Sequence, residues 1–228
     1  MILATHQPIF LPWPGFFFKA MQADRLVLLD QVQFPRGRGW MNRNRLKSEQ
    51  GELWLTVPVH KKGRGLQTVQ TVEIFHDNDW RKKHLRSISQ NYARAPYLAE
   101  YFPQIESVYQ KKYRLLVEFN LALISLVAEA LSLQGKLLLQ SQLNATGKGT
   151  DLLVDVCKKA QAQVYLTFPG VQKYLDLEKM ARNGIQTTLV NFHPPVYPQL
   201  WGDFIYNLST LDLLLNCGPK SGEIVGKC

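Results

Sequence analysis

The sequence has few cysteines and no long apolar run. Its three cysteines, Cys157, Cys217 and Cys228, are scattered and form no C-x-x-C pair, so neither a disulfide framework nor a structural zinc site is indicated. The most apolar segment, residues 121–133, contains Glu129. It is too short for a membrane span, so we interpret it as a buried helix. The first residues show no basic region followed by a long apolar core, so we expect no secretory signal. We therefore expect a cytoplasmic protein.

Positive charge is the most informative feature of the composition. The 228 residues include 27 Lys and Arg against 18 Asp and Glu, a formal net charge of +9. The surplus is densest in PRGRGWMNRNRLK, which holds Arg36, Arg38, Arg43, Arg45 and Lys47 and no acidic residue. Such a field favours an anionic partner: phosphate, nucleotide, nucleic acid or anionic lipid. The alternative is a solvated basic surface, and the glycines and aromatics between the arginines give the two readings equal weight.

Apolar runs alternate with helical patterns at both ends of the chain. Strands are expected at residues 1–5, 25–30, 53–59, 136–143, 164–168 and 185–192, and helices at 15–24, 150–159, 176–184 and 207–218. The alternation predicts a three-layer α/β fold with a mostly parallel sheet and helices on its faces. Residues 35–47 are predicted to form a basic loop. The mostly helical residues 78–133 are interpreted as an insertion or subdomain within a single domain that covers residues 1–228.

In such sheets ligands bind beyond the carboxyl ends of the strands. His6, Asp30 and His193 each lie at the carboxyl end of a predicted strand. They are far apart in the sequence, yet a parallel sheet would place them on one rim. We therefore expect one shared concave site there. A metal ion held by these three side chains is conceivable, but no metal site is predicted and no cofactor is indicated.

The turn after the first strand combines a histidine with three prolines and a glycine. Pro8, Pro12 and Pro14 stiffen the chain between His6 and the following helix by fixing φ. The unpaired N–H groups that begin this helix could bind an anion, and Gly15 would allow a close approach to the backbone. A histidine with a near-neutral pKa could steady a phosphate or transfer a proton there. A buried His6 bonded to backbone is the alternative.

The remaining candidate residues are polar, charged or aromatic groups in loops. Asp30 is predicted to orient an amine, a hydroxyl or a metal, and its charge requires a partner such as Arg43, Arg45 or a ligand. The two arginines are predicted to clamp phosphates. The other candidate binding residues are Gln7, Trp13, Gln31, Gln33, Asn42, Asn44, His193, Tyr197, Gln199 and Ser209.

Several stretches resemble the WbqC-like protein family. They are HQPIFLPWPGFFFKAMQAD, LLDQVQF, NRNRLK, WLTVPV, YLTFPGVQKYLD, PVYPQLWGDF and NLSTLDLLLNCG, in this order over nearly the whole chain. The resemblance implies a bacterial cytoplasmic enzyme or enzyme-like protein associated with surface polysaccharides and amino sugars. The family tends to have Ser-Gly after the YL pair, where this chain has Thr167 and Phe168 followed by Pro169 and Gly170.

A more distant likeness is architectural. Nucleotidylyltransferases and pantoate–amino acid ligases also begin with a strand, a histidine-containing proline/glycine turn and a helix, although the H-x-G-H signature is absent here. Together these features predict a transferase that binds a nucleotide, a nucleotide-sugar or another anionic small molecule. It would move an acyl, aminoacyl or nucleotidyl group in surface-polysaccharide or amino-sugar biosynthesis. Two alternatives remain: a nucleic-acid-binding module that uses Trp40 and Trp54, which is less favoured, and a non-catalytic glycan-assembly factor at a membrane surface.

Overall fold

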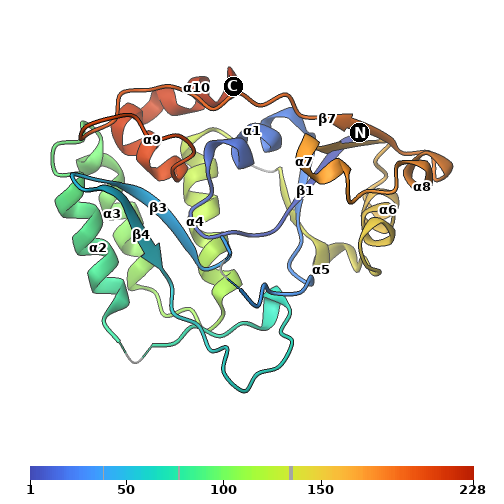
Figure 1. Ribbon diagram of the computed structural model, residues 1–228, viewed down its shortest axis with the longest axis horizontal. Helices are drawn as coiled ribbons and strands as arrows, with labels where there is room; N and C mark the ends of the chain where they lie inside the picture. The colour runs from blue at the N-terminus through green and yellow to red at the C-terminus, as the bar shows by residue number, and fades with distance from the viewer. Residues whose placement is uncertain (38, 77, 134–135) are drawn as a thin grey trace.

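A five-stranded parallel sheet organises one half of the molecule (Figure 1). The computed structural model describes residues 1–37, 39–76, 78–133 and 136–228. The strand order is β5-β2-β1-β6-β7, and every neighbouring pair is parallel. The strands are β1 (Ile2–His6), β2 (Arg25–Leu28), β5 (Leu137–Leu139), β6 (Val164–Thr167) and β7 (Gln186–Leu189).

The central strands β2, β1 and β6 are buried on both faces because they are apolar at successive positions. Ala4 and Leu26 belong to one hydrophobic cluster, whereas their neighbours Leu3 and Val27 belong to another. Successive side chains of a strand point to opposite faces, so the two clusters are the two sides of the sheet. The first side is covered by α1 (Pro14–Gln22), and the second by α6 (Thr150–Lys159) and α8 (Leu177–Arg182). This confirms the predicted α/β fold with flanking helices.

The other half of the molecule is a hairpin packed on helices. Strands β3 (Arg43–Ser48) and β4 (Gly51–Thr56) are antiparallel. They pack with helices that lie at the left of Figure 1, and the hydrophobic cluster here is continuous with the first side of the sheet. These helices are α2 (Trp80–Asn91), α3 (Leu98–Gln110), α4 (Leu116–Ala130) and α9 (Thr210–Cys217). The short elements are η1 (Val69–Thr71), α5 (Gln140–Leu143), α7 (Pro169–Gln172), η2 (Gly218–Lys220) and α10 (Ser221–Gly226).

Two secondary-structure predictions are wrong in part. Residues 43–47, expected in a loop, lie in β3, where Asn44 and Leu46 are buried and Arg43 and Arg45 are only half-buried. This alternation of more and less buried side chains is typical of a strand. It was missed in the sequence because most of these positions are basic or polar rather than apolar. Residues 140–143, expected in a strand, form α5 instead. Arg38, part of the predicted basic loop, lies outside the described residues.

The loop that follows β1 is fixed by hydrogen bonds to its carbonyl oxygens. Three elements donate to residues 8–12: Asn120 Nδ2 on α4, Asn44 Nδ2 on β3, and the backbone N–H of Thr210 at the start of α9. Leu11 in this loop has a φ of +44°, a conformation that L side chains rarely adopt. The loop itself follows the central strand of the sheet, whereas these partners belong to the other half of the molecule, so the loop holds the two halves together at one point.

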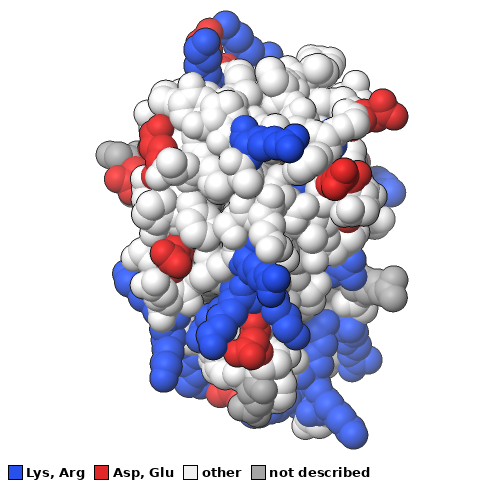
Figure 2. All heavy atoms as spheres, turned by 90° about the vertical axis from the view of Figure 1, so that its left-hand side faces the viewer, with Lys and Arg blue, Asp and Glu red and all other residues white. Residues whose placement is uncertain are grey.

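Positive charge is spread over more than one face. Figure 2 shows many lysine and arginine side chains on the lower part of the face over α2 and α3, where α2 alone contributes the sequence WRKKHLR. The charge surplus therefore does not by itself single out one binding site. Among the described residues, no helix combines the length and the apolar character that a membrane span requires.

Candidate functional site

The sheet has a topological switch point between β1 and β6. From β1 the chain builds the sheet in one direction through β2 and β5, and it then crosses to the other side for β6 and β7. Ligands of open α/β sheets bind beyond the carboxyl ends of the strands at such a point. His6 is the last residue of β1, and it lines a pocket of about 560 Å³.

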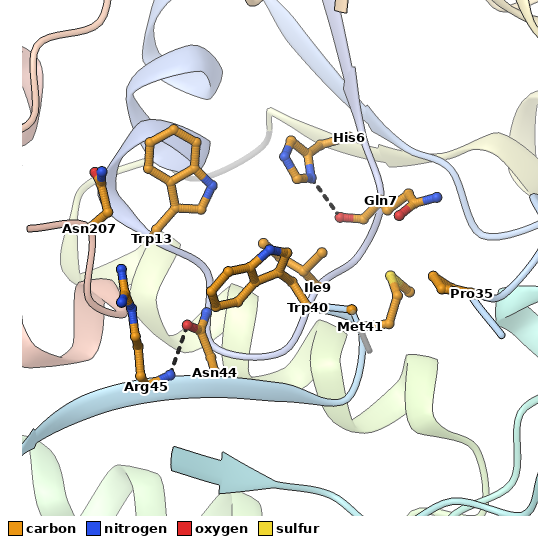
Figure 3. A pocket seen from close by; sticks show the side chains of 11 residues that line it. His6, Gln7, Ile9, Trp13, Pro35, Trp40, Met41, Asn44, Arg45 and Asn207 are labelled. Atoms are coloured by element: carbon orange, nitrogen blue, oxygen red, sulfur yellow. Dashed lines mark hydrogen bonds between the residues drawn. The ribbon is translucent and has the colours of Figure 1, made fainter. Parts of the chain in front are cut away.

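The pocket brings together residues from distant parts of the chain (Figure 3). One wall comes from β1 and the loop after it, and another from β3 and the segment that precedes β3. In Figure 3, His6 and Trp13 lie on one side of the pocket and the Asn44 and Arg45 side chains rise from β3 on the other. Five candidates from the sequence line it: His6, Gln7, Trp13, Asn44 and Arg45. The other lining residues are Ile9, Pro35, Gly39, Trp40, Met41 and Asn207.

The half-buried His6 is held as one tautomer of its neutral imidazole. Its Nδ1 lies 2.8 Å from the carbonyl oxygen of Gln7. A carbonyl can only accept, so Nδ1 carries the proton and Nε2 keeps a lone pair. Burial, and then the charge of Lys19, lower the pKa of His6 to about 3, although the bond to Gln7 raises it. The expectation of a near-neutral pKa is therefore wrong, and His6 offers a ligand an acceptor nitrogen rather than a positive charge.

Lys19 is a buried amine behind this wall. It lies on α1, its Nζ donates to the carbonyl oxygen of Thr5 at 2.7 Å, and Nζ is 4.9 Å from the ring centroid of Phe168. Among the described residues no carboxylate forms an ion pair with it. Burial lowers the pKa of Lys19 to about 7. The sequence analysis missed this residue, whose signal is a lone lysine within the apolar helix PGFFFKAM.

Gly15 is required by the indole of Trp13. A Cβ at Gly15 would lie 2.3 Å from the Trp13 ring, which covers the first turn of α1. The close approach expected at Gly15 therefore comes from the protein itself. Trp13 also packs against Phe168 and Phe192, with ring centroids 5.5 and 5.1 Å away. Phe168, where this sequence departs from the expected Ser-Gly, thus helps to hold the wall of the pocket.

Two stacked tryptophans extend the site outward. The rings of Trp40 and Trp54 lie 5.6 Å apart at an angle of 24°, and they are 48% and 40% exposed. The guanidinium of Arg43 lies 3.8 Å from the Trp54 ring centroid, and that of Arg45 lies 5.9 Å from Trp40. Arg45 is also paired with Glu52. Arg43 therefore stacks on Trp54 outside the pocket lining, and its part in a phosphate clamp stays a prediction.

Comparison with known proteins gives the same family as the sequence motifs. The profile of the WbqC-like protein family matches residues 7–224, nearly the whole chain. The chain belongs to the WbqC-like protein family. It is 30% identical over 228 residues to the uncharacterized protein Rv1507c of Mycobacterium tuberculosis, and the match covers 99% of this chain and 98% of that one. No solved structure gives a significant match to the chain.

Asp30, Asn42 and His193 are among the candidates of this WbqC-like protein that lie outside the pocket lining. Asp30 is buried and accepts hydrogen bonds from the backbone N–H and the hydroxyl of Ser141, at 3.0 and 2.6 Å. The expected partners Arg43 and Arg45 form no ion pair or hydrogen bond with it. Ser141 takes their place, since β5 pairs with β2 and is followed directly by α5, in which Ser141 lies. Asn42 donates to the carbonyl oxygen of Val57 at 2.9 Å. His193 is exposed in the segment after β7.

The candidates near the C-terminus satisfy one another inside the protein. The hydroxyl of Tyr197 donates to Asp212 at 2.8 Å, and Gln199 accepts from Lys47 Nζ at 3.1 Å. Burial and the nearby charge of Asp212 raise the pKa of Tyr197. Ser209 caps α9 by accepting from a backbone N–H of its first turn. These side chains hold the fold and are not available to a ligand as they stand.

Gln31 and Gln33 line a different pocket of about 420 Å³, beyond the ends of β2 and β5. Among the described residues, no three histidine, cysteine or acidic side chains are grouped so that they could hold a metal ion.

Proposed function

We propose that this protein is a group-transfer enzyme that binds a nucleotide or nucleotide-sugar in the switch-point pocket. The observation that carries the proposal is the junction at Trp40, which belongs both to the pocket and to the exposed stack with Trp54. The pocket volume of about 560 Å³ lies within the range of small-molecule sites. A flat ring can stack outside while the rest of the ligand enters the pocket.

The stack is suited to a planar ring. Tryptophan faces bind nucleobases without need of a sequence-specific hydrogen bond, and the open edge beside Gly39, Trp40, Arg43 and Trp54 leaves a hollow of about 200 Å³. The anionic part of the ligand would meet Arg45, whose guanidinium is already oriented by Glu52 and by the carbonyl oxygen of Tyr206, 3.2 Å from Nη2. A guanidinium held in this way offers directed donors to phosphate oxygens.

His6 supplies the acceptor for the group that attacks. Its Nε2 would accept a hydrogen bond from a hydroxyl or amine of the second substrate. As that oxygen or nitrogen forms its new bond to the carbonyl carbon or phosphorus, the proton moves to Nε2 and the leaving group departs with the electrons of the broken bond. Burial and the charge of Lys19 lower the pKa of His6. The negative charge of a bound phosphate would raise this pKa and make Nε2 a more effective base.

The setting follows from the family resemblance. Its association with surface polysaccharides and amino sugars supports an acyl, aminoacyl or nucleotidyl transfer to or from a sugar in the cytoplasm. Asp30, expected to share the catalysis, is held by Ser141 and has no part in this mechanism.

Calorimetric titration with nucleotides and nucleotide-sugars tests the proposal. At least one uridine or adenine nucleotide should bind, and Trp40→Ala should weaken that binding about tenfold, the order expected for the loss of one stacking ring. Arg45→Gln should weaken the binding of phosphorylated ligands more than that of the nucleoside. Arg86→Ala is the matched control, because Arg86 is exposed on α2 away from the pocket lining. Absence of binding by every nucleotide, or equal binding by Trp40→Ala, would refute the proposal.

The exposed tryptophans also fit the nucleic-acid alternative. A polymer that neutralises many basic residues releases counterions, so its affinity falls steeply with salt. A single-stranded oligonucleotide that binds much more tightly than the mononucleotide, with a steep salt dependence, would favour that alternative.

A further inference from the structure

The second pocket, beyond the carboxyl ends of β2 and β5, shares no lining residue with the switch-point pocket. It measures about 420 Å³. Its walls are the segment after β2, residues 66–68, the start of α5, and the loop that leads into α6. The proposed function gives this pocket no role.

Amide side chains dominate its walls. Gln31, Gln33, Gln67 and Gln140 all line it. Within the described part of the chain, the first two have side-chain amides without a hydrogen-bond partner. Gln140 is only 3% exposed; its Nε2 donates to the carbonyl oxygen of Ala145 at 3.0 Å, whereas its Oε1 has no partner among the described residues. Each amide can both donate and accept, which is the pairing that a hydroxyl group needs.

One end of the pocket is positive. Lys148 lies between Gly147 and Gly149, whose φ angles are +109° and +53°. A Cβ at Gly147 would lie 3.0 Å from the backbone nitrogen of Leu152, so the loop packs tightly on the first turn of α6. Gly149 is the N-cap of α6 and has no side chain to cap this turn. A helix N-terminus of this kind favours negative charge, and Asp151 in the same turn is already paired with Lys179.

We propose that the second pocket binds a polyhydroxylated small molecule with one anionic group, such as a sugar phosphate or a sugar acid. The glutamine amides pair with its hydroxyl groups, and Lys148 with the start of α6 takes the anion. None of the described residues that line the pocket is aromatic. They offer no stacking surface for a nucleobase, and the pocket thus complements the switch-point pocket.

The two sites are connected along one surface. A hollow of about 360 Å³ lies between them, with Arg36 and Lys61 in its wall. It shares Pro35 with the switch-point pocket, and Leu66 and Gln67 with the second pocket. A ligand in the second pocket would therefore lie along the same rim as one bound at His6.

Calorimetry with glucose 6-phosphate and glucuronate as probes tests the second pocket, with glucose and inorganic phosphate as partial ligands. At least one charged sugar should bind saturably and more tightly than either partial ligand. Lys148→Ala and Gln31→Ala should each weaken this binding at least fivefold. Lys158→Ala is the matched control, because Lys158 is exposed near the other end of α6. Circular dichroism and the melting temperature establish that each variant is folded.

Trp40→Ala separates this proposal from the proposed function. Trp40 lines only the switch-point side, so its loss should leave charged-sugar binding unchanged even if nucleotide binding disappears or never existed. The inference is overturned if neither charged sugar binds to the unaltered protein. It is also overturned if phosphate alone binds as tightly, if Lys148→Ala and Gln31→Ala both bind normally, or if Trp40→Ala abolishes charged-sugar binding.

Discussion

Lys19 Nζ donates a hydrogen bond of 2.7 Å to the carbonyl oxygen of Thr5, one residue before His6. The bond places a buried amine at the carboxyl end of the central strand. Burial lowers the pKa values of both residues, and the charge of Lys19 lowers that of His6 further. The protonation states of Lys19 and His6 should therefore affect the free energy of unfolding as well as the chemistry of the pocket.

Lys19→Met should change how stability depends on pH. The pKa of Lys19 is about 7 in the folded protein, against an ordinary value of 10.5. Between these values the unfolded chain binds more protons, so the free energy of unfolding should rise with pH there, by at most about 1.4 kcal/mol per pH unit. The methionine variant should lose this rise. Its His6 should also titrate at a higher pH.

Urea unfolding at several pH values above neutrality measures the first effect, and NMR of the imidazole measures the second. Lys158→Met is the control, since Lys158 is exposed, and it should keep the full rise. An identical pH dependence in Lys19→Met would show that the buried amine is not the source.

His6→Ala and His84→Ala should fail in different ways. His84 is buried, its Nε2 accepts from the backbone N–H of Thr56 at 3.2 Å, and its Nδ1 lies 3.2 Å from the Tyr109 hydroxyl. Its loss should cost about 2 kcal/mol or more, because a cavity and unpaired polar groups remain. His6 faces the pocket, so its loss should cost less than about 1 kcal/mol yet reduce activity strongly.

Chemical denaturation gives both free energies of unfolding, and a group-transfer assay with the nucleotide that binds most tightly gives the effect on activity. If His6→Ala unfolds the protein while its folded fraction keeps full activity, His6 is a core residue and the mechanism loses its base.

Gly15→Ala should destabilise the protein through Trp13. The added methyl group would lie 2.3 Å from the indole, so the ring must leave its place against Phe168 and Phe192. We expect a loss of about 1–3 kcal/mol, the usual cost of overpacking, and a red shift of tryptophan emission. At Gly170, in the short helix α7, a Cβ would meet nothing within 4 Å, so Gly170→Ala should be nearly neutral. Equal stability of the two variants would contradict this account.

Asp212→Asn should cost more stability than Tyr197→Phe. The carboxylate of Asp212 is fully buried and accepts from the hydroxyls of Tyr92 and Tyr197, at 2.5 and 2.8 Å. The amide oxygen of asparagine can still accept from one tyrosine hydroxyl, but an NH2 group, which only donates, replaces the oxygen that accepts from the other. That second bond is lost or must reverse its direction. We expect a loss of about 2–3 kcal/mol, against about 1 kcal/mol for the single bond removed by Tyr197→Phe. Urea unfolding of the two variants at neutral pH measures both losses, and a larger loss in Tyr197→Phe would contradict the prediction.

The sheet could be predicted from the sequence because the apolar runs of its central strands are visible without knowledge of their tertiary contacts. The apolar runs around Ala4, Leu26 and Leu166 are buried on both faces, and a doubly covered strand is apolar throughout. Strand β3 was missed because Arg43 and Arg45 occupy its half-buried positions, where charge hides the alternation. Their stabilising contacts, a tryptophan face and a glutamate, come from β4.

The pocket was predicted only in part for a similar reason. His6 was found because a strand end in a parallel sheet has a defined place. Tyr197 and Gln199 have the same polar character as true ligand-binding groups, but their partners lie inside the protein. Sequence reasoning cannot tell an internal partner from an external one. Lys19 was missed because a lysine in a helix is normally solvated, and only the tertiary structure buries it.

The hydrogen bond from Thr210 to Pro12 has a consequence for protein synthesis. The residues after β1 leave the ribosome long before Asn207, which completes the pocket wall, and before the start of α9. A nascent chain therefore lacks a finished pocket until these later residues have emerged and packed against the loop. Products truncated before Asn207 would be unable to form the pocket.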